Sequence, residues 1–367
     1  MGTTETKKMR VGVVGCGAIS DIYLTNMIHN FENLEVAACC AGHLEHAKKK
    51  AEQYGIKGCT YEEILADPSI EMVVILTPAP THEGLIRQAL EAGKHVYTEK
   101  TMTLAPETAA KLIELAEEKH LYLGSAPDTF LGSALQTARK AIDDGLIGEV
   151  TSFEACANRD LDLLASIFRF LRMPGGGICY DFGVYYLTAI VSLFGPVDRV
   201  VSSVRNLAAK RVNIIPGSPE YGQEFDYTNE SQVFTILEMK NGVTGTFCVN
   251  GDSVINDQAV FTIYGKKGIL KLVDPNNFGG DVVYIPGVKD WTQQTVPEVL
   301  HYGFDYSRGL GPSEMAEAIA EGRPNRASAK MAYHVLDTID QIMKSAETGA
   351  FEKVPSTCER PEAMPNS

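Results

Sequence analysis

The chain has 367 residues, a length that fits two domains or one large one. Hydrophobic residues make up 44% of it and charged residues 22%, so most of the chain is able to bury a core. Its 33 basic and 47 acidic residues give a net charge of −14, which repels phosphate backbones and anionic lipid. No run approaches the ~20 apolar residues that a bilayer span needs. Composition therefore argues against a membrane protein and against nucleic acid as a partner.

Eight scattered cysteines form no C-x-x-C pair. This pattern is typical of reduced, buried thiols, so we expect neither a disulfide framework nor a metal site. The polar start Met1–Arg10 contains no apolar signal-peptide core, which indicates a cytoplasmic protein.

Short apolar runs alternate with amphipathic segments in the first third of the chain. We expect buried strands at Val11–Val14, Leu34–Cys40, Met72–Leu76, His95–Thr98 and Leu121–Gly124. Helices are expected between them at Ile19–Asn30, His43–Tyr54, Pro80–Ala92 and Pro106–His120. Such alternation predicts an α/β domain with a parallel sheet covered by helices on both faces.

The pattern changes after about residue 130. We expect helices at Leu135–Asp144, Pro312–Glu321 and Ala327–Ser345, and strands at Gly148–Asn158, Val197–Val204, Glu230–Lys240, Val243–Val249, Gln258–Tyr264 and Gly268–Leu272. Asn241-Gly242 between two of these strands is a hairpin signal. We therefore predict two domains, residues 1–128 and 129–367, the second with an open, mostly antiparallel sheet and with C-terminal helices able to pack back on the first.

A glycine turn follows the first expected strand. Gly15 permits the tight turn, Gly17 lets a pyrophosphate approach the backbone, and the helix beyond offers free N–H groups. Ser20 replaces the third glycine of the motif. In this strand–turn–helix setting the motif predicts dinucleotide binding, with a purely structural turn as the alternative.

The end of the second strand, Cys40-Ala41-Gly42-His43, lacks the acid that would hold the ribose of NAD. This stretch also contains no arginine to bind the 2′-phosphate of NADP, although His43 and Lys48 are able to bind it. A solvated position at the start of a helix is the simpler interpretation of both His43 and Lys48. The sequence therefore does not decide between NAD and NADP.

Two further groups of residues carry chemistry. Thr77 and the Glu99-Lys100 pair each follow a strand, at the edge of a parallel sheet where ligands collect. A lysine there is able to donate to a substrate oxygen or, if desolvated, to accept its proton. Further on, Asp181 and Tyr185 open a helix behind a glycine run. Asp181 as a plain N-cap is one interpretation; the other has both side chains facing a cleft between the domains.

The glycine turn, Ala-Gly-Lys-His-Val-x-x-Glu-Lys and Asp-x-Gly-x-Tyr occur in that order, and together they resemble the Gfo/Idh/MocA oxidoreductase family over nearly the whole chain. The resemblance implies a Rossmann domain, an α/β domain whose open sheet often mediates oligomerisation, and NAD(P)-dependent chemistry on sugars or polyols. It implies Lys100, Tyr185 and Asp181 as the catalytic residues. With His43, the cofactor-binding set is Gly15, Gly17, Ala18, Ile19, His43, Thr77, Pro78, His82, Glu99 and Lys100.

Three positions depart from the family pattern. Thr101 replaces a proline whose peptide bond is often cis, and because a non-proline cis bond costs ~3 kcal/mol, we expect the Lys100 loop to be set differently. Ala41 replaces the aspartate of NAD-using members, and Thr188 replaces a second substrate-binding aspartate. Candidates to replace that carboxylate are Asp128, Asn158, Arg159, Arg169 and His301.

The leading hypothesis is hydride transfer between nicotinamide and a secondary hydroxyl or ketone of a sugar, polyol or glycoside, with C3 of a glycoside as one position. Tyr185 would act as acid and base, with Lys100 lowering its pKa. One alternative is a glycoside-cleaving enzyme that oxidises its substrate transiently, and another is a dinucleotide-binding sensor without catalysis. The expected partners are a carbohydrate or glycoside substrate and further copies of the chain, as a dimer or tetramer.

Overall fold

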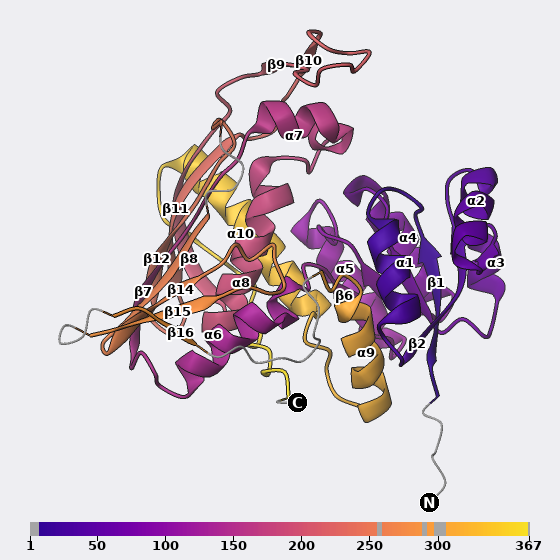
Figure 1. Cartoon of the computed structure of the whole chain (residues 1–367), viewed down its shortest axis with the longest axis horizontal. Coiled ribbons are helices and arrows are strands. Elements are labelled where there is room, and N and C mark those ends of the chain that lie inside the picture. The colour runs from indigo at the N-terminus through magenta and orange to yellow at the C-terminus, as the bar shows by residue number, and fades with distance from the viewer. Residues whose placement is uncertain (1–6, 255–258, 288–291, 297–305, 366–367) are drawn as a thin grey trace, which may run out of the picture. The chain divides into compact units, whose positions relative to one another are not determined.

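The computed structural model describes residues 7–254, 259–287, 292–296 and 306–365. The chain divides into two compact units. The first comprises Met1–Asp128 and Ser307–Ala332, and the second Thr129–Tyr306 and Tyr333–Ser367. Each unit has its own sheet (Figure 1).

The sheet of the first unit has six parallel strands in the order β3-β2-β1-β4-β5-β6. This order defines a Rossmann fold, and its switch point lies between β1 and β4. The strands are β1 (Met9–Val14), β2 (Leu34–Cys40), β3 (Lys57–Gly58), β4 (Met72–Ile75), β5 (His95–Thr98) and β6 (Leu123–Ser125). The helices between them are α1 (Ser20–His29), α2 (Leu44–Tyr54), α3 (Tyr61–Ala66), α4 (His82–Glu91) and α5 (Pro106–Glu118).

The short elements β3 and α3 were not predicted, because neither is long enough to show a hydrophobic period. A local signal for α3 does exist: Thr60 and Glu63 form a capping box. The Glu63 amide donates to Thr60 Oγ1 at 3.2 Å, and the Thr60 amide donates to the Glu63 carboxylate at 2.8 Å.

The first unit is completed by a segment from far along the chain that contains α9 (Leu310–Glu321). The Ser125 amide donates to Ala327 O at 3.1 Å, which ties this segment to the end of β6. Glu314 on α9 is fully buried and pairs with Arg323 and Arg326 at 2.5 and 2.8 Å.

The second unit is built on a nine-stranded sheet in the order β16-β15-β14-β13-β7-β12-β11-β8-β17. Its central pair, β7 and β12, is parallel, while the other pairs are antiparallel. The strands are β7 (Val150–Asn158), β8 (Val197–Arg205), β11 (Gln232–Met239), β12 (Thr244–Asn250), β13 (Ala259–Gly265), β14 (Gly268–Leu272), β15 (Val282–Pro286), β16 (Gln294–Val296) and β17 (Glu352–Lys353). The predicted hairpin at Asn241-Gly242 joins β11 to β12, with Gly242 at φ +90°.

Helices α6 (Ser133–Asp143), α8 (Val184–Phe194) and α10 (Ala329–Thr348) lie along one face of this sheet (Figure 1). Burial along β11 agrees with helices covering one face, because it alternates with the two-residue period of a strand. Val233 and Leu237 are fully buried, whereas Phe234 and Ile236 are exposed. At one end of the sheet lie α7 (Leu161–Ile167) and the small hairpin of β9 (Lys210–Val212) and β10 (Glu224–Asp226). Among the described helices, none is both long and apolar enough to cross a bilayer.

Candidate active site

The glycine turn between β1 and α1 has the geometry that a pyrophosphate needs. Gly15 adopts φ +108°, and a Cβ there would lie 2.9 Å from the Leu76 carbonyl carbon, so only glycine fits. A Cβ on Gly17 would meet nothing within 4 Å, so the backbone faces open space. Helix α1 begins at Ser20 without a side-chain cap; the Ser20 amide donates to Gly17 O at 3.0 Å, and the partial positive charge of the helix start remains for an anion. These residues fit a dinucleotide.

In a Rossmann fold the residues after the second strand face the cofactor's ribose, which makes Ala41 and His43 the candidates for the 2′ position here. Ala41 is partly exposed and His43 is exposed at the start of α2, where its side chain makes no capping hydrogen bond. The His43 ring lies edge-on to His46, with centroids 5.5 Å apart. Lys48 pairs instead with Glu45 at 3.0 Å. Ala41, Gly42 and His43 thus supply neither a carboxylate nor an arginine directly after β2, and the nearby carboxylate of Glu45 is paired with Lys48.

His82 holds together the loops that follow β4 and β5. Its ring is fully buried, with Nδ1 2.8 Å from Thr101 O and Nε2 2.7 Å from Thr77 O. Burial lowers the pKa of His82, against the opposing effect of the two carbonyl groups. Since both ring nitrogens contact backbone, this side chain positions the two loops and does not reach outward to a ligand.

Glu99 and Lys100 lie at the end of β5. Glu99 is buried, accepts a hydrogen bond from the Tyr23 hydroxyl at 2.6 Å and another from the Lys100 amide at 3.1 Å. Burial alone would raise the pKa of Glu99, but the charges of Arg308 and Lys100 bring it below the ordinary value. The Lys100–Thr101 peptide bond is cis, so the expectation that Thr101 sets this loop differently is wrong.

Behind this loop lies a buried charge cluster of Glu99, Asp128 and Arg308. Asp128 has no exposed surface, accepts from the Gly311 amide at 2.8 Å, and lies 3.5 Å from the Arg308 guanidinium. Burial raises the pKa of Asp128 to about 6, despite the opposing charge of Arg308. Sequence reasoning missed Arg308, since nothing local relates it to β5 or β6.

In the second unit, residues Cys179–Gly183 form a single π-helical turn that leads directly into α8. Asp181 lies within this turn, and its amide donates to Gly177 O at 2.8 Å. Asp181 is therefore not an N-cap, and that alternative is wrong. The start of the turn is instead bound by Glu230, whose carboxylate accepts from the Cys179 amide at 2.9 Å.

Tyr185 lies in the first turn of α8 and is 7% exposed. Its ring packs against that of Phe182, with centroids 6.1 Å apart. The turn and α8 thus bring Asp181 and Tyr185 to the same end of one helix, as the motif spacing predicts.

The remaining candidates have structural partners. Asn158 accepts from Asn250 at 3.0 Å. Arg159 is buried, pairs with Asp274, and stacks 3.7 Å above the Phe182 ring. Arg169 is exposed and pairs with Glu220 at 2.5 Å, and His301 lies outside the described residues.

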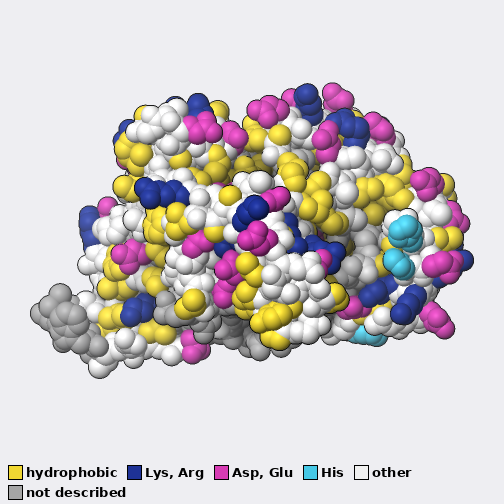
Figure 2. Space-filling view, turned by 90° about the horizontal axis from the view of Figure 1, so that it is seen from above, with side chains coloured by type: hydrophobic (Ala, Val, Ile, Leu, Met, Phe, Trp, Pro, Cys, Tyr) yellow, Lys and Arg dark blue, Asp and Glu magenta, His cyan; other side chains and the backbone are white. Residues whose placement is uncertain are grey.

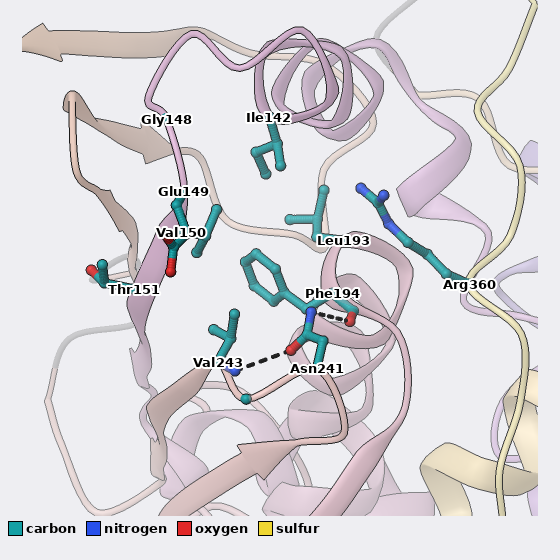
Figure 3. A pocket seen from close by; sticks show the side chains of 11 residues that line it. Ile142, Gly148, Glu149, Val150, Thr151, Leu193, Phe194, Asn241, Val243 and Arg360 are labelled. Carbon is teal, nitrogen blue, oxygen red and sulfur yellow. Dashed lines mark hydrogen bonds between the residues drawn. The ribbon is translucent and has the colours of Figure 1, made fainter.

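No group of side chains suited to a metal ion occurs among the described residues. A cavity of about 700 Å³ in the second unit is lined mainly by α6, α8, the start of β7 and the β11–β12 hairpin (Figure 3). Asn241 on that hairpin donates to Phe194 O at 3.0 Å and accepts from the Val243 amide at 3.1 Å. None of the predicted site residues lines this cavity.

The net negative charge of the protein does not attract an anionic cofactor. Figure 2 shows acidic and basic side chains interspersed over the visible face, and the whole chain carries −14. The glycine turn and the start of α1 are the candidates to supply the attraction for a pyrophosphate.

A six-stranded Rossmann sheet with an open glycine turn defines a dinucleotide-binding domain. Sequence comparison gives the family. Residues 9–126 match an oxidoreductase family with an NAD-binding Rossmann fold, and residues 135–271 match the GFO/IDH/MocA C-terminal domain. The chain belongs to the Gfo/Idh/MocA family of oxidoreductases, whose cofactor is NAD or NADP.

Curated relatives include dehydrogenases that act on hydroxyl groups. The chain is 22% identical to scyllo-inositol 2-dehydrogenase (NADP(+)) of Bacillus subtilis, over 94% of this chain and 96% of that one. It is 25% identical to trans-1,2-dihydrobenzene-1,2-diol dehydrogenase of Bos taurus, over 85% and 88%. It spans only 55% of an uncharacterized oxidoreductase of Schizosaccharomyces pombe, at 31% identity over 201 residues.

Solved structures share the fold. Levoglucosan dehydrogenase in complex with NADH and L-sorbose has a TM-score of 0.82 at 20% identity, covering 95% of this chain and 99% of that one. A putative NADPH-dependent oxidoreductase from Desulfitobacterium hafniense has a TM-score of 0.78 at 21% identity, covering 95% and 98%. These likenesses confirm a Rossmann domain followed by a domain with an open, largely antiparallel sheet.

Proposed function

We propose that this protein transfers hydride between nicotinamide and a secondary hydroxyl or ketone of a sugar, polyol or glycoside, with C3 of a glycoside as a candidate position. The observation that carries the proposal is the loop after β5, where Lys100 follows a buried, fully partnered Glu99 beside an intact dinucleotide turn. The levoglucosan and inositol dehydrogenases among its relatives support a carbohydrate-like substrate.

Each motif has a separate task in this proposal. The bound dinucleotide supplies a carbon that takes up or gives back hydride. The turn at Gly15, Gly17, Ala18 and Ile19 binds its pyrophosphate, and the loop of Thr77 and Pro78, fixed by His82, runs along it.

Lys100, which is partly exposed, donates to the reacting oxygen, while Glu99 holds the lysine's own backbone amide. Tyr185 exchanges the proton of the substrate hydroxyl, and its near-complete burial keeps water away from its phenol. Asp181 binds a neighbouring hydroxyl of the substrate.

The test is a spectrophotometric screen of sugars, polyols and glycosides with both NAD⁺ and NADP⁺, followed by variants on the best substrate. Lys100→Met and Tyr185→Phe should each lower kcat by roughly 10²- to 10⁴-fold, and Tyr185→Phe should leave dinucleotide affinity within about threefold. Lys111→Met, an exposed lysine on α5, is the matched control and should behave as wild type. Wild-type kcat in Lys100→Met would refute the assignment.

The same screen separates the two alternatives. A glycoside-cleaving enzyme that oxidises and re-reduces its substrate would release product with no net change in reduced nicotinamide. A sensor would bind dinucleotide and turn over none of the compounds. The presence of both Lys100 and Tyr185 favours the dehydrogenase.

We also propose that the outer face of the nine-stranded sheet joins copies of the chain. Apolar side chains stand out on it, with Phe234, Ile236 and Val260 each exposed by 44–48%. Ile236→Lys should shift the mass measured by light scattering toward the monomer. Dinucleotide binding serves as the control for folding.

A further inference from the structure

The turn that carries Asp181 is supported by a carboxylate from another part of the chain. Glu230 lies two residues before the start of β11, and its side chain accepts from the Cys179 amide at 2.9 Å. Its backbone carbonyl accepts from the preceding amide, that of Ile178, at 3.2 Å. One residue therefore binds two successive N–H groups at the start of the π turn, where no side chain of the turn itself acts as a cap.

The glycine run before the turn makes room for this carboxylate. A Cβ on Gly177 would lie 1.9 Å from Glu230 Oε2 and 2.0 Å from Oε1, so any side chain there displaces Glu230. The Gly177 carbonyl meanwhile accepts from the Asp181 amide. The same glycine thus contacts both the carboxylate and the residue proposed to bind substrate.

Neighbours of Glu230 bind the rest of the loop before the turn. Asn229 donates to Leu171 O at 3.0 Å and to Met173 O at 2.8 Å, and the Tyr227 hydroxyl lies 3.4 Å from Gly176 O. Residues 227–230, which we call the clamp, therefore hold the backbone from Leu171 to Cys179. Within the clamp, Glu230 is an ionisable residue whose side chain binds the start of the π turn.

The Glu230 carboxylate is in a setting that favours its neutral form. Burial raises the pKa of Glu230 to about 7, with hydrogen bonds from backbone amides, that of Cys179 foremost, opposing the rise. The titratable and charged groups that face it or its immediate neighbours are Cys179, Tyr180 and Asp181 from the turn, Tyr227 from the clamp, Arg211 and Asp252 beyond Tyr227, and Asp340 from α10.

We propose that Glu230 is a positioning residue of the active site: its carboxylate holds the start of the π turn and thereby sets the places of Asp181 and Tyr185. Protonation replaces a charge-assisted hydrogen bond, which is about twice as strong as a neutral one, by a neutral bond, and the turn loosens. Activity then falls on the acid side of neutrality. This inference rests on the proposed function for its link to turnover, but not for its link to the turn.

The first experiment compares pH profiles of kcat/KM for wild type, Glu230→Gln, Glu230→Ala and the exposed control Glu224→Gln. Wild type and the control should lose activity below an apparent pKa near 7. Glu230→Gln keeps a hydrogen-bond acceptor but cannot ionise. Its kcat/KM should therefore show no such transition and should stay near the low-pH value of wild type at every pH. Glu230→Ala loses the cap and should fall by roughly 2- to 30-fold at every pH. An unchanged transition in Glu230→Gln would overturn the proposal.

The second experiment does not depend on activity. Amide hydrogen exchange over residues 178–183 should be faster in Glu230→Ala than in wild type at the same pH, while exchange over β1 and β4 is unchanged. Gly177→Ala, which displaces the same carboxylate, should have the same local effect. Equal exchange in wild type and Glu230→Ala would refute the positioning role. Faster exchange in a chain that turns over no substrate would instead refute the proposed function and leave the positioning role supported.

Discussion

Arg308→Met tests the buried charge cluster behind the Lys100 loop. Arg308 is 3% exposed and its guanidinium lies 3.5 Å from Asp128, which is fully buried. It also lowers the pKa of buried Glu99. The variant keeps the length of the side chain but leaves two carboxylates without this cation. Removing one partner of a buried ion pair costs about 3–5 kcal/mol, so we expect a loss of that size in the free energy of unfolding at pH 8.

The pH dependence of this loss provides the sharper test. Burial raises the pKa of Asp128 to about 6 even beside Arg308, and without the guanidinium it rises further, while the pKa of Glu99 rises from its lowered value. A carboxyl whose folded-state pKa is raised stabilises the fold at low pH and loses that contribution as pH increases. The penalty of Arg308→Met should therefore shrink by roughly half between pH 8 and pH 5.

The assay is urea unfolding followed by circular dichroism at both pH values, with the transition of the Rossmann unit identified by its shift on adding NADPH. Arg87→Met, a partly exposed arginine paired with Glu83, is the matched control and should change stability by less than about 0.5 kcal/mol. A loss below about 1 kcal/mol at pH 8, or a larger loss at pH 5 than at pH 8, would refute the reasoning.

Three further predictions concern the cofactor turn, the 2′ position and the second unit. Gly15→Ala should lower the free energy of unfolding by about 1–2 kcal/mol or more, and it should also lower NAD(P) affinity. Gly17→Ala, whose new methyl group meets open space, should lower only the affinity. Equal losses of stability in the two variants, measured by thermal unfolding, would contradict this. Ala41→Asp should weaken NADP⁺ relative to NAD⁺ by roughly tenfold in fluorescence titrations, because the new carboxylate repels a 2′-phosphate; an unchanged ratio would place the 2′ group elsewhere. His334 is buried and accepts from the Val197 amide at 2.9 Å, and burial lowers its pKa to about 4. The neutral form of His334 therefore stabilises the fold above pH 6.5, the pKa of an unfolded histidine, and this contribution of up to about 3 kcal/mol is lost as the pH falls toward 4. His334→Gln should reduce the dependence of stability on pH in that range. An unchanged slope would show that another group titrates there.

The fold follows from sequence where elements are long and regular. The alternation of buried strands and amphipathic helices is strong enough to predict the Rossmann sheet, and Asn241-Gly242 predicts its hairpin from local chemistry alone. The π turn at Cys179–Gly183 is different, because helix periodicity does not distinguish it from a first turn of α8. Asp181 consequently looked like an N-cap, although the carboxylate that binds the start of that turn is Glu230, about 50 residues away.

The two units share a feature that no local pattern reveals. Lys100 follows Glu99 in the chain, and Asp181 lies within a turn whose start is bound by Glu230, so in each case a carboxylate fixes the backbone beside a proposed catalytic residue. Each such carboxylate costs desolvation energy, which a fold optimised for stability alone would avoid. The carboxylates are held by residues distant in sequence: Arg308 lies about 200 residues from Glu99, and Cys179 about 50 from Glu230. Motif spacing therefore identifies the residues that face the substrate, whereas the groups that hold them in place emerge only when the chain is folded.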